Sequence, residues 1–252
     1  MKTLILKFAN FLSIFWRLLP KYIRLNLITG LMILDSRDKD TKRGLKQLLL
    51  IKDKLEWILN ERAMTYGNGE HPKHKLIRYH YFFSDRIKNG QNVLDIGCGY
   101  GAVARTIAKV HKKSKVIGID IDQDKIVQSQ QFKNPKNLKF YKFDATQNVP
   151  KGSWDVIILS NVLEHITNRV EFLKKIHLTT KCKHFLIRVP NFERDWQMPM
   201  RKLLKINYYS DDDHKIEHTV DEFIFEMTKA ELKINELKTL WGEIWADCMI
   251  DK

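Results

Sequence analysis

A buried strand that runs directly into a glycine-rich loop constrains this chain more than any other feature. The apolar segment 93–96 is followed by Gly97, Gly99 and Gly101 at alternate positions, and then by a helical segment from Ala102. Glycine adopts backbone conformations that other residues avoid, so the loop can turn sharply and approach a ligand closely. The helix that follows would offer free N–H groups and the positive end of its dipole. This order predicts a nucleotide-type binding site in an α/β fold.

A second predicted strand makes this context more specific than the loop alone. The segment 116–120 is apolar and closes with Asp120, about 20 residues after the loop. An acid at this position in a doubly wound sheet holds ribose hydroxyls, because a carboxylate accepts two hydrogen bonds from a vicinal diol. Asp122 is placed to cap a helix over 123–131.

Together, these segments resemble motifs I and II of class I S-adenosylmethionine-dependent methyltransferases, in the small-molecule branch of types 11 and 12. The resemblance continues through a third strand with its terminal acid (138–145), a fourth strand with its loop (154–166) and a fifth strand (183–191). It implies a Rossmann-like, doubly wound, mostly parallel seven-stranded sheet with helices on both faces. It also implies S-adenosyl-L-methionine as the cofactor and methyl transfer as the reaction.

The resemblance further implies which residues hold the cofactor. The glycine loop would wrap the methionine part, Asp120 would bind the ribose, and Asp144 would face the adenine amino group. The expected set is Tyr79, Asp95, Gly97, Cys98, Gly99, Gly101, Asp120, Ile121, Asp144, Ala145 and Asn161. Taken from its surroundings alone, Asp144 could equally cap a turn, and Cys98 is expected to be a packed small residue and not a nucleophile.

Histidines are the candidate catalytic groups, because a base of near-neutral pKa would remove a proton from a hydroxyl or amine acceptor. His165 follows the fourth strand, where it would either transfer the proton or support the loop by a hydrogen bond. His218 precedes a helix that begins with a Thr219–Glu222 capping box. His214, His218 and the acids 211–213 could ligate a metal, but no second ligand cluster accompanies them. We therefore predict a solvated loop there and no metal site.

An insertion after the fifth strand is the predicted acceptor lid. Its aromatic and methionine residues are Phe192, Trp196, Met198, Met200, Tyr208 and Tyr209. The alternative is an additional packing element. We expect a methyltransferase domain over 70–252, with the lid near 192–218, one helix over 76–87, and final antiparallel strands at 234–240 and 242–249.

The positive charge of the chain is concentrated before this domain. The sequence carries a net charge of +14, and residues 1–92 hold 18 Lys and Arg against 8 Asp and Glu. Residues 93–252 hold 26 bases and 22 acids, so the catalytic domain itself has little excess. Its fourth strand is followed by Ser160-Asn161-Val162-Leu163 and not by a base-flipping motif of the Asn/Asp-Pro-Pro-Tyr type. A nucleic-acid acceptor is therefore not expected.

Residues 1–69 form a predicted basic and apolar helical extension. The first 34 residues contain five bases and no acid, and their polar residues recur at steps of three and four, close to the helical period. Pro20 is expected to end one helix and open another. The uncharged stretches are too short for a membrane span of about 20 residues, and no small-residue cleavage site marks a signal peptide. Two readings stay open: an interfacial helix on an anionic membrane, or a helix docked on protein.

The expected function is methyl transfer to a small or membrane-associated acceptor, with a hydroxyl on a glycan or lipid-linked sugar preferred. A quinone or lipid acceptor comes next, and a non-catalytic scaffold that kept the fold is the rival class. Three widely spaced cysteines form neither a disulfide framework nor a zinc pattern. This composition predicts a cytoplasmic protein, with residues 1–34 as a possible contact to the cytoplasmic membrane face.

Overall fold

The computed structural model describes the backbone of residues 2–68 and 71–250, and side chains from residue 8 onward. The chain divides into two compact units. One unit comprises the chain up to His71 together with Leu203–Ile206, and the other comprises the rest of the chain from Pro72.

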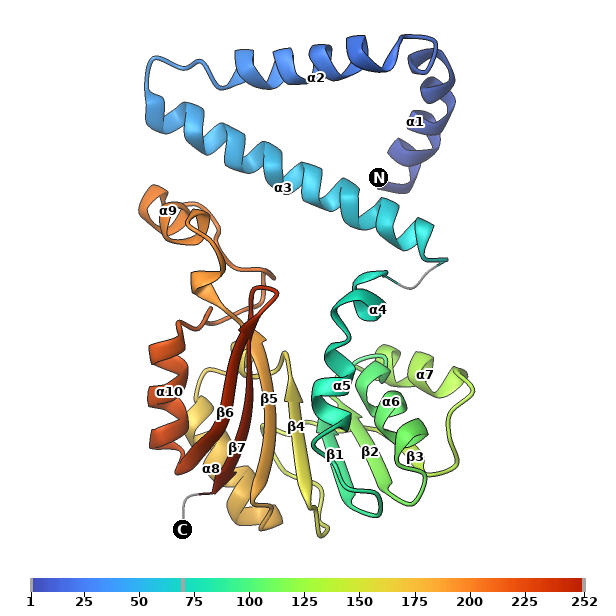
Figure 1. Ribbon diagram of the computed structural model, residues 1–252, viewed down its shortest axis with the longest axis vertical. Coiled ribbons are helices and arrows are strands. Elements are labelled where there is room, and N and C mark those ends of the chain that lie inside the picture. Colours follow the sequence, from blue (N-terminus) through green and yellow to red (C-terminus); the bar gives the residue numbers. More distant parts are fainter. Residues whose placement is uncertain (1, 69–70, 251–252) are drawn as a thin grey trace. The chain divides into compact units, whose positions relative to one another are not determined.

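The larger unit is built on one seven-stranded sheet (Figure 1). The strands are β1 (Asn92–Ile96), β2 (Lys115–Asp120), β3 (Leu138–Lys142), β4 (Val156–Ser160), β5 (His184–Pro190), β6 (Leu232–Leu240) and β7 (Glu243–Ile250). Their order is β3-β2-β1-β4-β5-β7-β6, and only β7 pairs antiparallel with its neighbours. The predicted doubly wound, mostly parallel sheet is confirmed.

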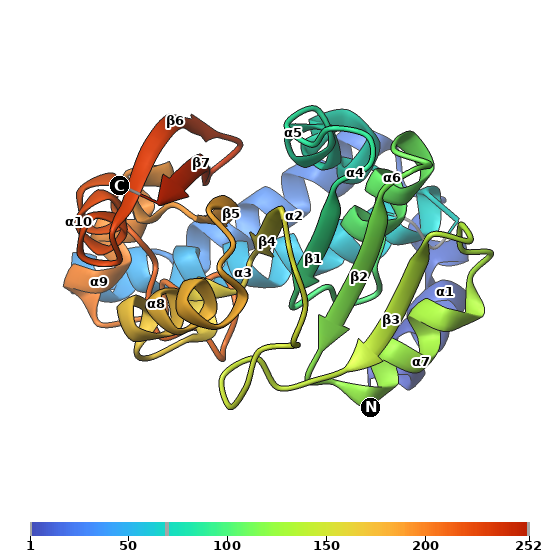
Figure 2. The same cartoon turned by 90° about the horizontal axis from the view of Figure 1, so that it is seen from below.

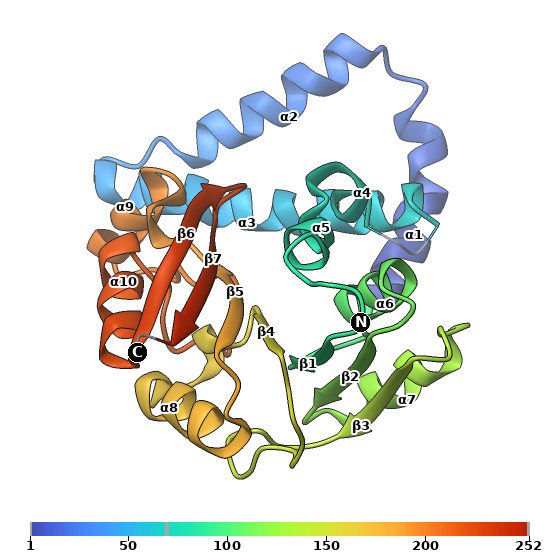
Figure 3. The same ribbon diagram turned by 60° about the horizontal axis from the view of Figure 1, so that its bottom comes forward.

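Helices cover both faces of this sheet, as Figures 2 and 3 show. One face carries α5 (Tyr79–Ser84), α6 (Ala102–Val110) and α7 (Gln123–Gln131), and the other carries α8 (Arg169–Thr180) and α10 (Val220–Lys229). The remaining elements after residue 71 are α4 (Lys73–Ile77), α9 (Gln197–Leu204) and the 3₁₀ turns η1 (Leu163–His165) and η2 (Phe192–Arg194). Two buried clusters result, one with α5, α6 and α7 and the other with α8 and α10. Successive residues of β4 alternate between the clusters, because strand side chains point to opposite faces.

The strand order places the functional end of the sheet between β1 and β4. The chain proceeds outward from β1 through β2 to β3, and then returns to β4 on the other side. The loops after β1 and β4 therefore separate at the carboxyl end of the sheet, where open α/β sheets bind their ligands. The glycine loop and the segment from Asn161 to His165 face each other across this point.

The prediction of one helix over 76–87 is wrong, because the structure has two short helices there. Arg78 separates α4 from α5 with a φ of 54°, a left-handed conformation that interrupts the helical hydrogen-bond ladder. The redirected α5 then buries Phe82 and Phe83 in the core. The guanidinium of Arg78 lies 4.6 Å from the ring centre of Tyr81 on the outer side.

The smaller unit consists of α1 (Lys2–Trp16), α2 (Lys21–Asp35) and α3 (Thr41–Tyr66). Pro20 stands immediately before α2, which confirms the predicted break. The amide of Gln47 donates to Asp35 Oδ2 at 2.6 Å, so α3 returns close to the end of α2. A Cβ atom on Gly44 would lie 2.2 Å from the carbonyl oxygen of Ser36, which requires glycine at this approach. None of the helices in the described part of the chain has the length and apolarity that a membrane crossing requires.

Candidate functional site

The glycine loop turns under the end of β1 with positive φ angles. Gly97 has a φ of 67°, and a Cβ atom there would lie 2.6 Å from Val162 Cγ2 in the loop after β4. Gly99 has a φ of 53°, but a Cβ atom there would have nothing within 4 Å. The fold therefore packs tightly against Gly97 and leaves the surface of Gly99 open, as a ligand-binding loop requires.

Asp120 joins this loop to the end of β2. Its Oδ2 accepts a hydrogen bond from the backbone N–H of Gly99 at 2.8 Å, and its Oδ1 accepts one from Asp122 at 2.9 Å. The backbone oxygen of Asp120 accepts a further bond from Phe143 at 2.8 Å. One residue thus holds the first, second and third strand ends in a common arrangement, with its carboxylate at the rim of a cavity.

The cavity has a volume of about 280 Å³ and lies at the carboxyl end of the sheet. It is lined by Ile96, Gly97, Gly99, Asp120, Ile121, Lys125, Phe143, Asp144, Ala145, Thr146, Asn161, Val162, His165, Ile166, Phe172 and Asp213. Seven of the eleven predicted cofactor-binding residues are in this set, together with the predicted catalytic residue His165.

Two of these lining residues owe their positions to their own hydrogen bonds. Asn161 has a φ of 57°, and its side-chain oxygen accepts from Arg188 Nε at 3.1 Å. Asp144 accepts two hydrogen bonds at Oδ1 from Thr146, at 2.9 Å from the amide and 2.6 Å from the hydroxyl. Asp144 therefore caps a turn and also lines the cavity, so its structural role and the predicted cofactor contact do not exclude each other.

Four predicted cofactor residues do not line the cavity. Gly101 begins α6, and Tyr79 is buried, with its hydroxyl 2.9 Å from His74 Nδ1 and the Arg188 guanidinium 3.9 Å from its ring centre. The thiol of Cys98 packs against Gly118 of β2. A Cβ atom on Gly118 would lie 2.9 Å from the sulfur atom. Burial raises the pKa of this thiol well above its usual range, so it is not a nucleophile.

Asp95 lies behind the glycine loop and is fully buried. Its Oδ2 has no hydrogen-bond partner among the described residues, while the backbone of Ala104 bonds to the carboxyl group. Burial and, to a smaller degree, the nearby charge of Asp120 raise the pKa of Asp95 to about 7.

His218 lies away from the cavity, contrary to the expectation of a base beside the acceptor. Its ring is completely buried, its Nε2 lies 3.0 Å from Glu226 Oε2, and Phe223 packs edge-on against it. Arg169 also binds Glu226. Although burial opposes it, the hydrogen bonds from His218 and Arg169 lower the pKa of Glu226 to about 2. His218 is therefore part of an ion-pair network that ties α10 to α8.

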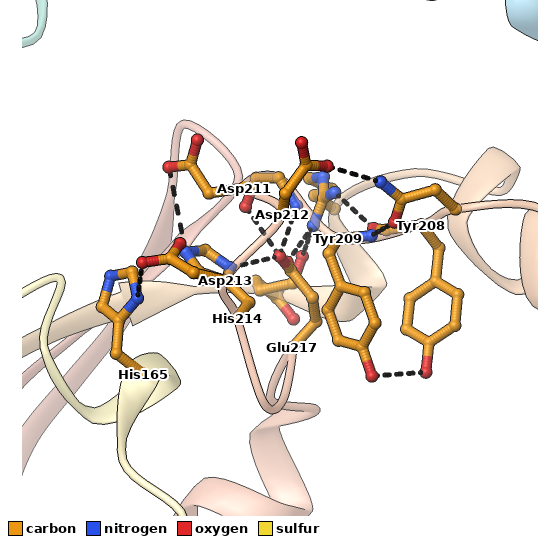
Figure 4. A network of polar contacts seen from close by, with 12 residues as sticks. His165, Tyr208, Tyr209, Asp211, Asp212, Asp213, His214 and Glu217 are labelled. Carbon is orange, nitrogen blue, oxygen red and sulfur yellow. Dashed lines mark hydrogen bonds and ion pairs between the residues drawn. The ribbon is translucent and has the colours of Figure 1, made fainter.

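His165 is half-buried at the cavity wall. Its Nδ1 lies 3.1 Å from Asp213 Oδ2, and its ring stands edge-on to that of His214 at 4.7 Å between centres (Figure 4). Burial lowers the pKa of His165, and Asp213 opposes this shift. The imidazole is therefore neutral and can accept a proton or bind a cation near neutral pH.

Part of this wall was not predicted from the sequence, which placed His214 and the acids 211–213 in a solvated loop. Lys125 and Asp213 line the cavity, and Glu164 and His214 lie directly behind His165. Burial raises the pKa of Glu164 to about 8. The available signals were the Glu-His pair after β4 and the acidic run at 211–213, which the sequence analysis assigned to solvent.

Known proteins resemble the part of the chain that carries this site. The family described as a methyltransferase domain matches residues 87–244, more than half of the chain. Probable (S)-tetrahydroprotoberberine N-methyltransferase 2 of Papaver bracteatum is 30% identical over 117 residues, covering 45% of this chain and 32% of that protein. Ribosomal protein L11 methyltransferase of Burkholderia orbicola (strain MC0-3) is 34% identical over 105 residues, covering 40% and 34%. The chain thus spans about a third of the length of these curated relatives.

A solved structure shares the fold. The crystal structure of a SAM-dependent methyltransferase from Aquifex aeolicus is 17% identical and has a TM-score of 0.54, over 72% of this chain and 94% of that chain. The chain therefore belongs to the methyltransferase domain family with the class I fold of S-adenosylmethionine-dependent enzymes.

The residues at the cavity fit the cofactor of this family. The sulfonium and ammonium groups of S-adenosylmethionine are cationic, and the unpartnered carboxyl oxygen of buried Asp95 lies behind the loop that would hold them. The open face of Gly99 leaves room for close approach, and Asp120 offers a carboxylate to a diol.

The raised pKa of Asp95 predicts a specific dependence of stability on pH. Between about pH 4 and pH 7, the folded protein holds a proton that the unfolded chain has released, so the free energy of unfolding falls as pH rises. Asp95→Asn removes this proton. Urea titrations at several pH values measure the free energy of unfolding of each protein. As pH rises, this free energy should fall less steeply for the variant than for wild type, by up to about 1.4 kcal/mol per pH unit. Asp124→Asn, an exposed control in α7, should follow wild type, and equal slopes for all three proteins would contradict the assignment.

Proposed function

We propose that this protein is an S-adenosylmethionine-dependent methyltransferase. The observation that carries the proposal is the position of Asp120, whose carboxylate stands at the rim of the cavity and is fixed by the N–H groups of Gly99 and Asp122. A carboxylate held in one orientation beside an open glycine loop can bind the two hydroxyls of a ribose without further reorganisation.

When bound, S-adenosylmethionine supplies an electrophilic methyl group, and the bond from carbon to the acceptor forms as the carbon–sulfur bond breaks. The chain's own contribution is then to position the acceptor, exclude water and receive a proton. Asp120 and Asp144 would hold the adenosine part of the cofactor. We assign the part of the cavity that His165 and Asp213 line, the acceptor wall, to the acceptor.

Isothermal titration calorimetry with S-adenosylmethionine tests the cofactor assignment. We expect wild type to bind one equivalent, and Asp120→Ala to bind at least tenfold more weakly because the ribose loses two hydrogen bonds to a charged group. Asp124→Ala changes an exposed acid four residues away and should bind as wild type does. The absence of binding by wild type would refute the proposed function, and full binding by Asp120→Ala would refute the ribose contact.

The proposed acceptor is a hydroxyl on a glycan or a lipid-linked sugar. The region between β5 and α10 offers flat aromatic surface, with Tyr208 and Tyr209 stacked at 4.5 Å between ring centres and Trp196 exposed. Such surfaces bind the apolar faces of rings and chains. The two relatives named above are an N-methyltransferase and a ribosomal protein methyltransferase by name, so amine and protein acceptors are the alternatives that the test must separate.

A transfer screen with methyl-labelled S-adenosylmethionine identifies the acceptor. Lipid, sugar and protein fractions are incubated with the full chain, and we expect label in the lipid or sugar fraction, stable to mild alkali as a methyl ether is. His165→Asn should lower the labelling rate by about 100-fold and leave cofactor binding intact. His177→Asn, in α8 and bonded to the carbonyl of Cys182, is the matched control. Label that enters only protein or amines would overturn the hydroxyl assignment.

We further propose that α1 and α2 bind the surface of an anionic membrane. Phe8, Phe11 and Phe15 are exposed on α1 at helical spacing, and the exposed bases Arg17 and Lys21 follow them. Aromatic side chains beside cations suit the boundary between headgroups and acyl chains. A lipid-linked acceptor would then lie in the same surface.

Co-sedimentation with phosphatidylglycerol vesicles tests this surface. Phe11→Ser with Phe15→Ser should lower the vesicle partition coefficient of the full chain at least tenfold, because two apolar groups no longer leave water. Leu178→Ser with Phe225→Ser changes two equally exposed apolar side chains on α8 and α10 and should pellet as wild type does. Equal pelleting by both double variants, or no binding by wild type, would refute the membrane contact.

A further inference from the structure

Three metal-binding side chains meet behind the acceptor wall of the cavity. Glu164, His165 and His214 each contribute one ligand atom, and these atoms all lie within 4.8 Å of one another. Glu164 and His165 belong to η1, and His214 lies in the loop that precedes α10. The backbone N–H of Lys215 donates to the carbonyl of Glu164 at 2.7 Å, so the two segments are joined next to the cluster.

Glu164 is the member of this cluster that most requires a partner. Its side chain is completely buried, and neither carboxyl oxygen has a hydrogen-bond partner among the described residues. The nearby cation Arg188 is directed elsewhere, with its Nε bonded to Asn161 and its guanidinium over the ring of Tyr79. A buried carboxylate without a donor or a cation costs several kcal/mol, so native structures rarely retain one.

His214 is oriented as a metal ligand. Its Nδ1 lies 2.9 Å from Glu217 Oε1, which fixes the proton on Nδ1 and leaves Nε2 as the free lone pair. Glu217 is held in turn by Ser210, at 2.6 Å from the amide and 2.7 Å from the hydroxyl, and by Arg194 at 2.6 Å. This carboxylate–histidine pair is the arrangement that supports imidazole ligands of metal ions.

The cluster lies beside the cavity. His165 and Asp213 line the cavity, whereas Glu164 and His214 are buried behind them. Asp213 Oδ2 lies 3.1 Å from His165 Nδ1, and the carboxylate of Asp211 lies 3.9 Å from His214 Nε2. Both acids add negative charge beside the two imidazoles.

We propose that Glu164, His165 and His214 bind a divalent first-row transition cation at the acceptor end of the cofactor cavity. Two imidazoles favour manganese, iron, cobalt or zinc over magnesium and calcium. Three protein ligands leave coordination positions open, as catalytic metal sites do. Ligand atoms that share such a cation lie roughly 3–4 Å from one another. Small side-chain rotations would bring the three ligand atoms to this spacing. This site replaces the sequence expectation of a solvated loop without metal.

The cation would deepen the proposed function, on which its catalytic role rests. An acceptor hydroxyl that approaches the open positions would be oriented toward the methyl group, and the cation would make its proton easier to lose to solvent water. His165 would then act as a ligand and not as a free base. The proposed acceptor is then a hydroxyl compound whose oxygen can reach the cation. An amine acceptor would not need this contact.

Titration of the EDTA-stripped full chain with Co²⁺ tests the site without reference to activity. We expect one equivalent to bind with a Kd in the micromolar range, and visible d–d absorption of cobalt with nitrogen and oxygen ligands. Glu164→Gln and His214→Asn should each weaken binding at least 100-fold. Glu171→Gln, an exposed glutamate in α8, is the matched control and should bind Co²⁺ as wild type does. Circular dichroism and S-adenosylmethionine binding report that each variant is folded.

The outcomes separate this proposal from the proposed function. If wild type does not bind Co²⁺, the metal site is overturned, even if S-adenosylmethionine binds normally. The same holds if folded Glu164→Gln and folded His165→Gln both bind Co²⁺ as wild type does. Co²⁺ binding without S-adenosylmethionine binding would support the site and refute the proposed function. If both bind, EDTA should abolish label transfer and Mn²⁺ should restore it, with cofactor affinity changed less than threefold. Transfer that persists in EDTA would overturn the catalytic role.

Discussion

The hydrogen bonds of Asp120 to the N–H groups of Gly99 and Asp122 are the interaction on which the functional end of this molecule depends. They follow from register, because parallel pairing of β1 with β2 sets Ile96 opposite Ile119 and brings both strand ends to one level. The glycine loop is then shaped by a charged acceptor and not by its own side chains. A carboxylate that organises the loop also presents itself to a ligand, so the fold and the site share one group.

The sequence predicted the parts of the fold that local physics determines. Apolar runs, glycine spacing and caps identified β1, β2, α6, α7 and α10, and the family resemblance supplied β3, β4, β5 and the doubly wound sheet. The break at Arg78 was not predictable, because a left-handed arginine is selected by the packing of Phe82 and Phe83 and not by its neighbours in sequence. The meeting of His165 with His214 was missed for the same kind of reason, since it depends on how the loop before α10 folds back.

His214 and His218 illustrate how little residue type decides by itself. The two lie four positions apart in the loop before α10, and both are buried, yet each has a different acidic partner. Glu226 and Arg169 hold His218 between helices, whereas Glu217 turns His214 toward η1 and the cavity. From the sequence, His218 and not His214 was the catalytic candidate, because His218 stands at the start of a capped helix after the fifth strand. Glu217, fully buried and bonded to Ser210 and Arg194, reverses that ranking.

The glycine loop contains residues under two different kinds of selection. Gly97 is required by the protein itself, since a methyl group there would meet Val162, whereas the space beside Gly99 is empty until a ligand enters it. A side chain at position 97 would meet Val162 in addition to the strain of a positive φ, whereas a side chain at position 99 would meet that strain alone and would occupy the space that a ligand needs.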